Sequence, residues 1–178
     1  VKFYSVKNSI IENNEFKSET REVWYEPLED EAFLDKVTIG GSGPKIISSE
    51  NITVESNVIV GVKGVGISVE GGKDNKIIKN KVLGDKESIS DAGIRIQDSA
   101  NITISENDIW DFKGGQDPDY PHGKIGAGID INGELTVAKF IEKNHLYNNS
   151  IGILVRIAGG TDSKSPFVDL KENQFIKN

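Results

Sequence analysis

Apolar positions recur along the chain in one short frame: an apolar residue, two intervening residues, Asn, one further residue and a second apolar residue. The frame is complete in six copies, at 11–16, 54–59, 77–82, 104–109, 141–146 and 170–175. A second frame, in which Gly precedes an apolar, a variable and an apolar residue, recurs at 66–69, 93–96, 128–131 and 152–155. Because strand side chains alternate between two faces, both frames predict short strands with one buried face.

The spacing of these copies predicts a solenoid. The shortest interval between successive frame asparagines, from Asn57 to Asn80, is 23 residues, and we interpret it as one coil of short strands. Longer intervals are then the same coil with loop insertions. Coils stacked about 4.8 Å apart pair in three parallel sheets around one apolar interior. The expected interior column consists of the first residue of each copy: Ile11, Val54, Ile77, Ile104, Ile141 and Leu170.

The asparagine of each copy is expected to stack at one corner of the coil. Asn tolerates left-handed turn geometry, and its amide can bond to the copies above and below. The members of this column are Asn14, Asn57, Asn80, Asn107, Asn144 and Asn173. Composition agrees, since Ile and Val far outnumber Leu and Ala, which favours strands over helices. The sequence therefore predicts an all-β protein.

The densest copy, Asp91 to Ile109 with the sequence DAGIRIQDSANITISENDI, resembles a coil of pectate lyases and polygalacturonases. In those proteins a strand turns through Ser-x-Asn into the next strand. The resemblance implies a right-handed parallel β-helix of the pectate-lyase-like superfamily, here with about six coils and incomplete at both ends. The superfamily includes polysaccharide lyases, glycoside hydrolases, uronan epimerases and non-catalytic surface proteins, so the fold alone assigns no chemistry.

Domain organisation follows from the repeat. We expect a single β-helix over 1–178, with an irregular insertion at 18–50 and the main loop insertion at 110–127. Both ends of the chain fall inside a coil, so further segments of the same protein are expected to cap the solenoid. The chain begins with Val1 and contains no Met, which indicates a processed, secreted protein at the cell surface or outside the cell.

Charge and cysteine content exclude several classes of function. The net charge of -7 disfavours nucleic acid as a partner, since that binding needs clustered positive charge. No apolar run approaches the roughly 20 residues that span a bilayer. Cys is absent, which removes disulfides, thiolate metal sites and cysteine nucleophiles. The expected partner is instead a polysaccharide or oligosaccharide.

The candidate functional face lies beside the main insertion. Outward positions of the second frame place Arg95 and Asp130 one coil apart, next to Asp91 and the loop 116–124. A lyase needs a base to remove the proton beside a uronate carboxylate, whereas a hydrolase needs two carboxylates about 5–9.5 Å apart. The candidate catalytic residues are Asp91, Arg95, His122, Lys124 and Asp130.

Other residues of this region are candidates for binding. Arg156 would hold a substrate carboxylate, and the rings of Trp110 and Tyr120 would stack on sugars. Asp117 and Asp119 offer the hard oxygen ligands that Ca²⁺ prefers, which makes calcium the candidate cofactor.

Two classes of function stay open at this point. The first is an extracellular polysaccharide lyase or glycoside hydrolase that acts on an acidic, plant or microbial glycan. The second is a non-catalytic solenoid that binds carbohydrate or serves as an architectural segment. On the second interpretation, Arg95 and Asp130 form an ordinary surface ion pair. His145 occupies an outward position of a regular coil and is not counted as a site residue.

Overall fold

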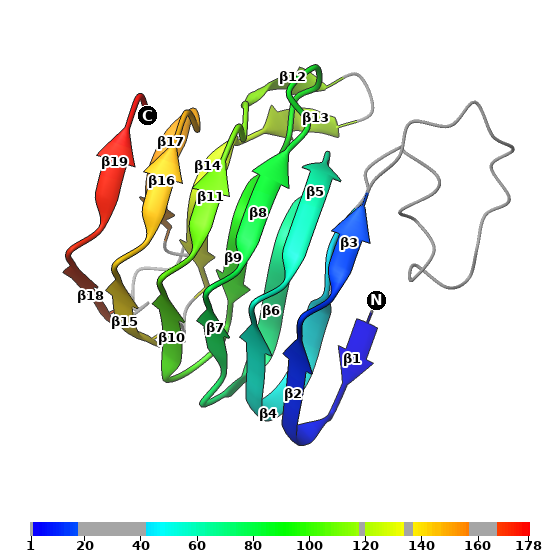
Figure 1. Ribbon diagram of the computed structural model, residues 1–178, viewed down its shortest axis with the longest axis vertical. Helices are drawn as coiled ribbons and strands as arrows, with labels where there is room; N and C mark the ends of the chain where they lie inside the picture. Colours follow the sequence, from blue (N-terminus) through cyan, green and yellow to red (C-terminus); the bar gives the residue numbers. More distant parts are fainter. Residues whose placement is uncertain (1, 18–41, 118–119, 134–136, 157–166) are drawn as a thin grey trace, which may run out of the picture.

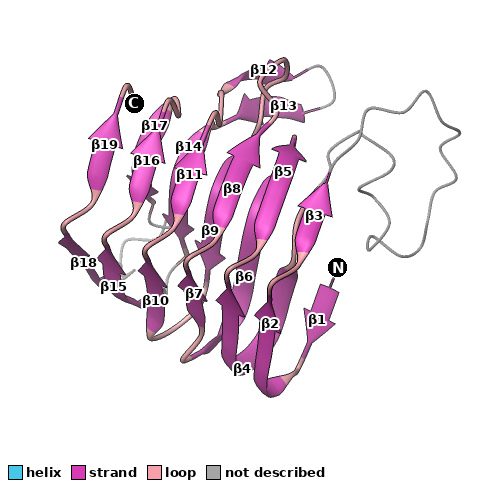
Figure 2. Ribbon diagram, in the orientation of Figure 1, coloured by secondary structure: helices cyan, strands magenta, loops and turns pink. Residues whose placement is uncertain are grey.

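The computed structural model describes residues 2–17, 42–117, 120–133, 137–156 and 167–178; of these, the side chains at 17, 117, 120–122, 137–139 and 167 are not described. Within these residues the chain forms strands and loops without a helix (Figure 2). The strands stack coil on coil into a parallel β-helix (Figure 1). The predicted all-β fold and its likeness to parallel β-helix proteins are therefore confirmed.

Each full coil contributes strands to three faces, as the coil with β9, β10 and β11 illustrates. Two faces form one 11-stranded sheet. Its strands are β1 (Lys2–Tyr4), β2 (Lys7–Glu12), β4 (Lys45–Glu55), β6 (Val65–Lys73), β7 (Lys76–Ile78), β9 (Ala92–Gln97), β10 (Ile102–Ser105), β14 (Ala127–Asn132), β15 (Val137–Glu142), β17 (Ile151–Val155) and β18 (Phe167–Lys171). The long β4 joins the two faces, because it pairs with both β6 and β7.

The third face is a separate 6-stranded parallel sheet, called the second sheet below. In spatial order its strands are β3 (Glu15–Lys17), β5 (Val58–Val62), β8 (Lys81–Gly84), β11 (Asp108–Trp110), β16 (His145–Tyr147) and β19 (Gln174–Ile176). They lie side by side in Figure 1. The three expected sheets thus correspond to three faces, two of which are continuous through β4.

The two insertions differ from a plain loop where the structure describes them. Residues 45–50, expected within the irregular insertion 18–50, form the first half of β4. Residues 18–41 lie outside the described part. The main insertion at 110–127 carries a small antiparallel hairpin of β12 (Gly115–Asp117) and β13 (Tyr120–Lys124). This hairpin stands above the solenoid in Figure 1.

The predicted interior column is confirmed by the strand register. Ile11 pairs with Val54, Val54 with Ile77, and Ile77 with Ile104. The column continues through Ile141 to Leu170. All but Leu170 are buried, and Leu170 is exposed in the last coil. Burial of this column fixes the strand register. The register in turn determines which side chains point outward, because a slip by one residue would reverse the two faces. Whether further segments cap the coils stays a prediction.

The asparagine column forms the predicted hydrogen-bond ladder. In each step the backbone N–H and the side-chain amide of one Asn donate to the side-chain carbonyl of the next, as from Asn80 to Asn107 at 2.9 and 3.0 Å. The side-chain amide of Asn107 also donates to the Ile77 carbonyl at 2.9 Å. These asparagines are buried from Asn57 to Asn144. The buried side-chain amides therefore have hydrogen-bond partners, which are the neighbouring ladder asparagines and backbone groups.

The left-handed backbone geometry of this corner lies one residue earlier than predicted. The preceding residue, and not the ladder Asn, has φ between 54° and 56°. We call these residues the corner row: Asn13, Ser56, Lys79, Glu106, Lys143 and Glu172. Their side chains lie outside the core, so the backbone conformation is imposed by the ladder beside them rather than by residue type.

Candidate functional site

Arg95 and Asp130 are neighbours across one coil step, as predicted. Arg95 lies in β9 and Asp130 in β14, and the two residues are directly paired in the parallel register. The Arg95 Nε donates to Asp130 Oδ2 at 2.8 Å. A second nitrogen of the Arg95 guanidinium, Nη2, lies 2.8 Å from Asp91 Oδ1, so this group bridges two carboxylates.

Arg156 binds the same carboxylate from the next coil. Its Nε donates to Asp130 Oδ1 at 3.0 Å and its Nη2 to Asp130 Oδ2 at 2.6 Å, which is bidentate geometry. The side chain of Asp130 has no exposed surface. We call Asp91, Arg95, Asp130 and Arg156 the Asp130 cluster. It contains two carboxylates and two guanidinium groups, so its formal charge is balanced.

The Asp130 cluster is poorly arranged for acid–base chemistry. Both oxygens of Asp130 already accept hydrogen bonds, and no part of the carboxylate is exposed to a substrate. Burial alone would lower the pKa of Arg95, but the carboxylates of Asp91 and Asp130 outweigh it and raise that pKa above its ordinary value. Arg95 therefore stays protonated and is not a general base. The geometry indicates a clamp that joins three coils.

The remaining predicted site residues are only partly described. Asp119 lies outside the described residues, and so do the side chains of Asp117, Tyr120 and His122. Lys124 ends β13 and is partly exposed. The convergence of this loop with the Asp130 cluster therefore stays a prediction.

Trp110 lies on a different face from the Asp130 cluster. It ends β11 of the second sheet, where it pairs with Tyr147 of β16 and Leu83 of β8. Tyr147 in turn pairs with Ile176 of β19. The two aromatic rings are thus outward residues on adjacent coils. Tyr147 is 39% exposed and Ile176 is 46% exposed, although both have large apolar side chains.

An open groove surrounds these residues, and we call it the Trp110 groove. Its lining residues are Glu106, Asp108, Trp110, Lys143, His145, Tyr147, Glu172, Gln174 and Ile176. It comprises two adjoining hollows, of about 330 Å³ over the aromatic rings and about 620 Å³ towards the corner row. Both hollows share Asp108, His145 and Gln174. Both hollows are wide open to solvent, so a ligand would lie on this surface rather than be enclosed by it.

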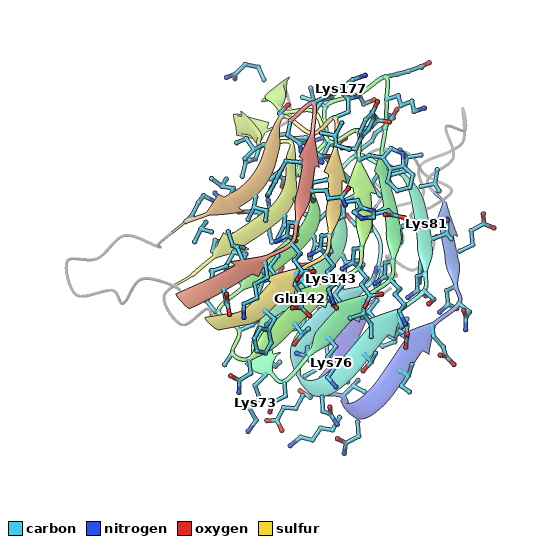
Figure 3. All side chains as sticks on the ribbon, turned by 60° about the vertical axis from the view of Figure 1, so that its left-hand side comes forward. Lys73, Lys76, Lys81, Glu142, Lys143 and Lys177 are labelled. Carbon is cyan, nitrogen blue, oxygen red and sulfur yellow. The ribbon has the colours of Figure 1, made fainter. Side chains whose placement is uncertain are left out.

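Three parallel rows line the groove, and each has one residue from each of three coils. The row nearest the corner is Glu106, Lys143 and Glu172; the middle row is Asp108, His145 and Gln174; the aromatic row is Trp110, Tyr147 and Ile176. The Asp108 Oδ1 and the His145 Nδ1 are 2.9 Å apart. Figure 3, which brings the β19 end forward, labels Lys143 and Lys177 on this side.

Lys177 closes one side of the aromatic row. Its Nζ donates to the Tyr147 hydroxyl at 3.3 Å and lies 5.5 Å from the centre of the Tyr147 ring. This contact is a cation–π interaction. It leaves the half-buried Trp110 as the stacking surface that borders the middle row.

Apart from Trp110, this groove was not recognised in the sequence, although a signal for it exists. The first and third residues after each ladder Asn point outward, and these positions hold Asp108 and Trp110 in one copy and His145 and Tyr147 in the next. The groove is formed by regular coils, so the loop insertions do not mark its position in the sequence.

No metal site is present within the described residues: they contain no group of three or more His, Cys, Asp or Glu side chains that could hold an ion. The same part of the chain has no helix that is long and apolar enough to cross a bilayer.

Comparison with protein families matches residues 1–117 to the family described as "Periplasmic copper-binding protein (NosD)". Searches of curated proteins and of solved structures found no match. The prediction of Ca²⁺ as cofactor is wrong, because the description of the matching family names copper. Asp117 and Asp119 were chosen for calcium on residue type alone, and Asp119 and the side chain of Asp117 lie outside the described part of the chain.

Proposed function

The chain belongs to the NosD family, and on that premise we propose that it is a carbohydrate-binding parallel β-helix of the bacterial periplasm or cell envelope that performs no chemistry of its own. The observation that carries this proposal is the Trp110 groove. A sugar ring offers an apolar face and a hydroxyl-rich edge. The groove places an aromatic row beside a middle row of Asp108, His145 and Gln174, which match those two surfaces.

The Asp130 cluster supports a non-catalytic role. A lyase or hydrolase built on Asp130 would need that carboxylate to reach a substrate, yet it is buried and bonded to two arginines. Asp91 and Asp130 are also unsuited to act as the two carboxylates of a hydrolase, because Arg95 lies between them and binds both. Binding without turnover requires none of these groups to be free.

Replacing Trp110 with alanine is expected to weaken glycan binding about tenfold or more, because buried aromatic anchors dominate interfaces of this kind. Trp110→Phe should retain most of the affinity, since the stacking face is kept. Calorimetric titrations with single, defined soluble oligosaccharides, one at a time and with intrinsic fluorescence as a second readout, measure the change.

Tyr4→Ala is the matched control for this experiment. Tyr4 is 58% exposed on β1, in the first coil and far from the groove along the solenoid (Figure 1). It should leave binding unchanged. Equal loss of affinity in both variants would argue against the groove. Release of shortened sugars by the wild-type protein would argue against a non-catalytic role.

Copper, which the family description names, does not fit the residues of this chain. Cu(I) sites draw on thiolate and thioether ligands, and Cu(II) sites draw on imidazoles together with further nitrogen or oxygen donors. The chain has no Cys, no Met and two His. His145 is described, and its Nδ1 contacts Asp108 rather than a second imidazole.

Dialysis of the protein against a copper-containing and then a copper-free buffer is therefore expected to leave well below one copper per chain. Elemental analysis by mass spectrometry provides the measurement. His145→Ala should retain the same low level as the wild type. One copper that survives dialysis, and that is lost on replacement of either histidine, would show that the chain does assemble a copper site.

A further inference from the structure

We infer that the Trp110 groove takes an uncharged linear glycan that lies along the solenoid axis, with one sugar unit over each coil. This inference rests on the proposed function and deepens it by naming the substrate class. It narrows the acidic, plant or microbial glycan expected from the sequence to an uncharged one.

The charges around the groove are balanced. Three carboxylates line it, at Glu106, Asp108 and Glu172. Three ammonium groups lie within or beside it. They are Lys143 in the corner row, Lys177 over the Tyr147 ring, and Lys81, which pairs in register with Asp108.

The signs of these charges also alternate from coil to coil. Along the corner row the order is Glu106, Lys143, Glu172, and the middle row places Lys81 beside Asp108. A polyanion or polycation would meet a repelling group at every second coil. The net charge of -7 adds a general repulsion of polyanions. An uncharged glycan experiences neither the local repulsion from alternating charges nor the general repulsion from the net charge.

Direction follows from the rows. The aromatic and middle rows both run across the strands, with a step equal to the coil spacing of about 4.8 Å. A pyranose unit in an extended β-1,4-linked chain advances by a similar length. Successive units would thus lie over Trp110, Tyr147 and Ile176 in turn, with Trp110 as the stacking ring and Lys177 beside the unit at Tyr147. Their hydroxyl edges would face Asp108, His145 and Gln174, which supply both donors and acceptors.

The test compares three β-1,4-linked hexamers that share one backbone geometry and differ in charge: glucose, glucosamine and glucuronate. Calorimetric titration of the intact chain should give the glucose hexamer an affinity at least about fivefold above the other two, the scale of a single exposed charge contact. Raising sodium chloride from low to high concentration should leave the glucose affinity unchanged within about twofold, since no charge is neutralised.

Chain length tests the direction. The glucose trimer should bind about as well as the hexamer, and the dimer about fivefold more weakly, because the dimer leaves one of three coils uncovered. Equal affinity for the dimer and the hexamer would overturn the axial placement.

Failure of this inference is distinguishable from failure of the proposed function. Tightest, salt-sensitive binding of a charged hexamer that Trp110→Ala abolishes would overturn the uncharged class and leave the binding function standing. Glucose-hexamer binding that Trp110→Ala leaves intact would overturn the placement in this groove. Absence of binding to all three hexamers would overturn both this inference and the proposed function.

Discussion

Replacing Asp130 with alanine is expected to lower the free energy of unfolding by about 3–5 kcal/mol, the cost of breaking a buried ion pair from one side. The change leaves Arg95 and Arg156 without the carboxylate that both bind. Arg95 keeps Asp91 as a partner, whereas Arg156 loses both of its described hydrogen bonds. Urea denaturation followed by far-ultraviolet circular dichroism measures the difference in stability.

Asp91→Ala provides the matched control. It removes a carboxylate from the same cluster, but one that is partly exposed and whose side-chain partner among the described residues is Arg95. Its loss is expected to cost no more than about 1 kcal/mol, as for other exposed ion pairs. If Asp130→Ala were no less stable than Asp91→Ala, the cluster would not act as a clamp. Catalysis by Asp130 would become the better interpretation if that variant kept its stability but lost a glycan-cleaving activity of the wild type.

Replacing Asn107 with alanine is expected to destabilise the fold by a comparable amount, about 3–5 kcal/mol, because several buried groups lose their partners at about 1–3 kcal/mol each. The Asn107 carbonyl accepts from the backbone and side chain of Asn80. Its amide donates to Ile77, Ser105 and Asn144. Alanine offers none of these bonds and leaves a cavity inside the coil.

Two measurements test this effect. Urea denaturation gives the loss of stability, and amide hydrogen exchange at Asn80 reports directly on the freed backbone N–H. Asn14→Ala is the control, because Asn14 is exposed at the first coil and donates to the ladder without accepting from an earlier ladder Asn. It should cost about 1 kcal/mol. Similar losses at Asn14 and Asn107 would contradict a ladder whose strength depends on burial.

The fold was predictable because its restraints repeat. The column from Ile11 to Leu170 and the asparagine ladder each have six members. A copy whose strand position is ambiguous by itself is therefore assigned from the other five. The left-handed position was predicted one residue too late, since Asn and the residue before it can both occupy a turn and the sequence does not distinguish them. Alternation also placed Arg95 beside Asp130 correctly.

Burial of the site was beyond reach of the sequence. Alternation assigns Asp130 to the outer face, but it does not reveal that Arg156, 26 residues later, folds over that carboxylate. Trp110 was selected as a stacking residue, yet it was assigned to the wrong neighbours, because its partner Tyr147 belongs to the next coil. Lateral neighbours of this kind depend on the exact length of each insertion, which the repeat does not restrict.

The corner row has a consequence for how such a protein can change over time. Its positions carry Asn, Ser, Lys, Glu, Lys and Glu, so the same left-handed conformation accommodates small, basic and acidic side chains alike. The ladder beside them holds the backbone in place whatever residue is present. Each coil therefore offers one position where mutation alters the surface and not the core. Substitutions in the corner row can therefore change the surface charge of one coil at a time, at positions spaced about 4.8 Å apart.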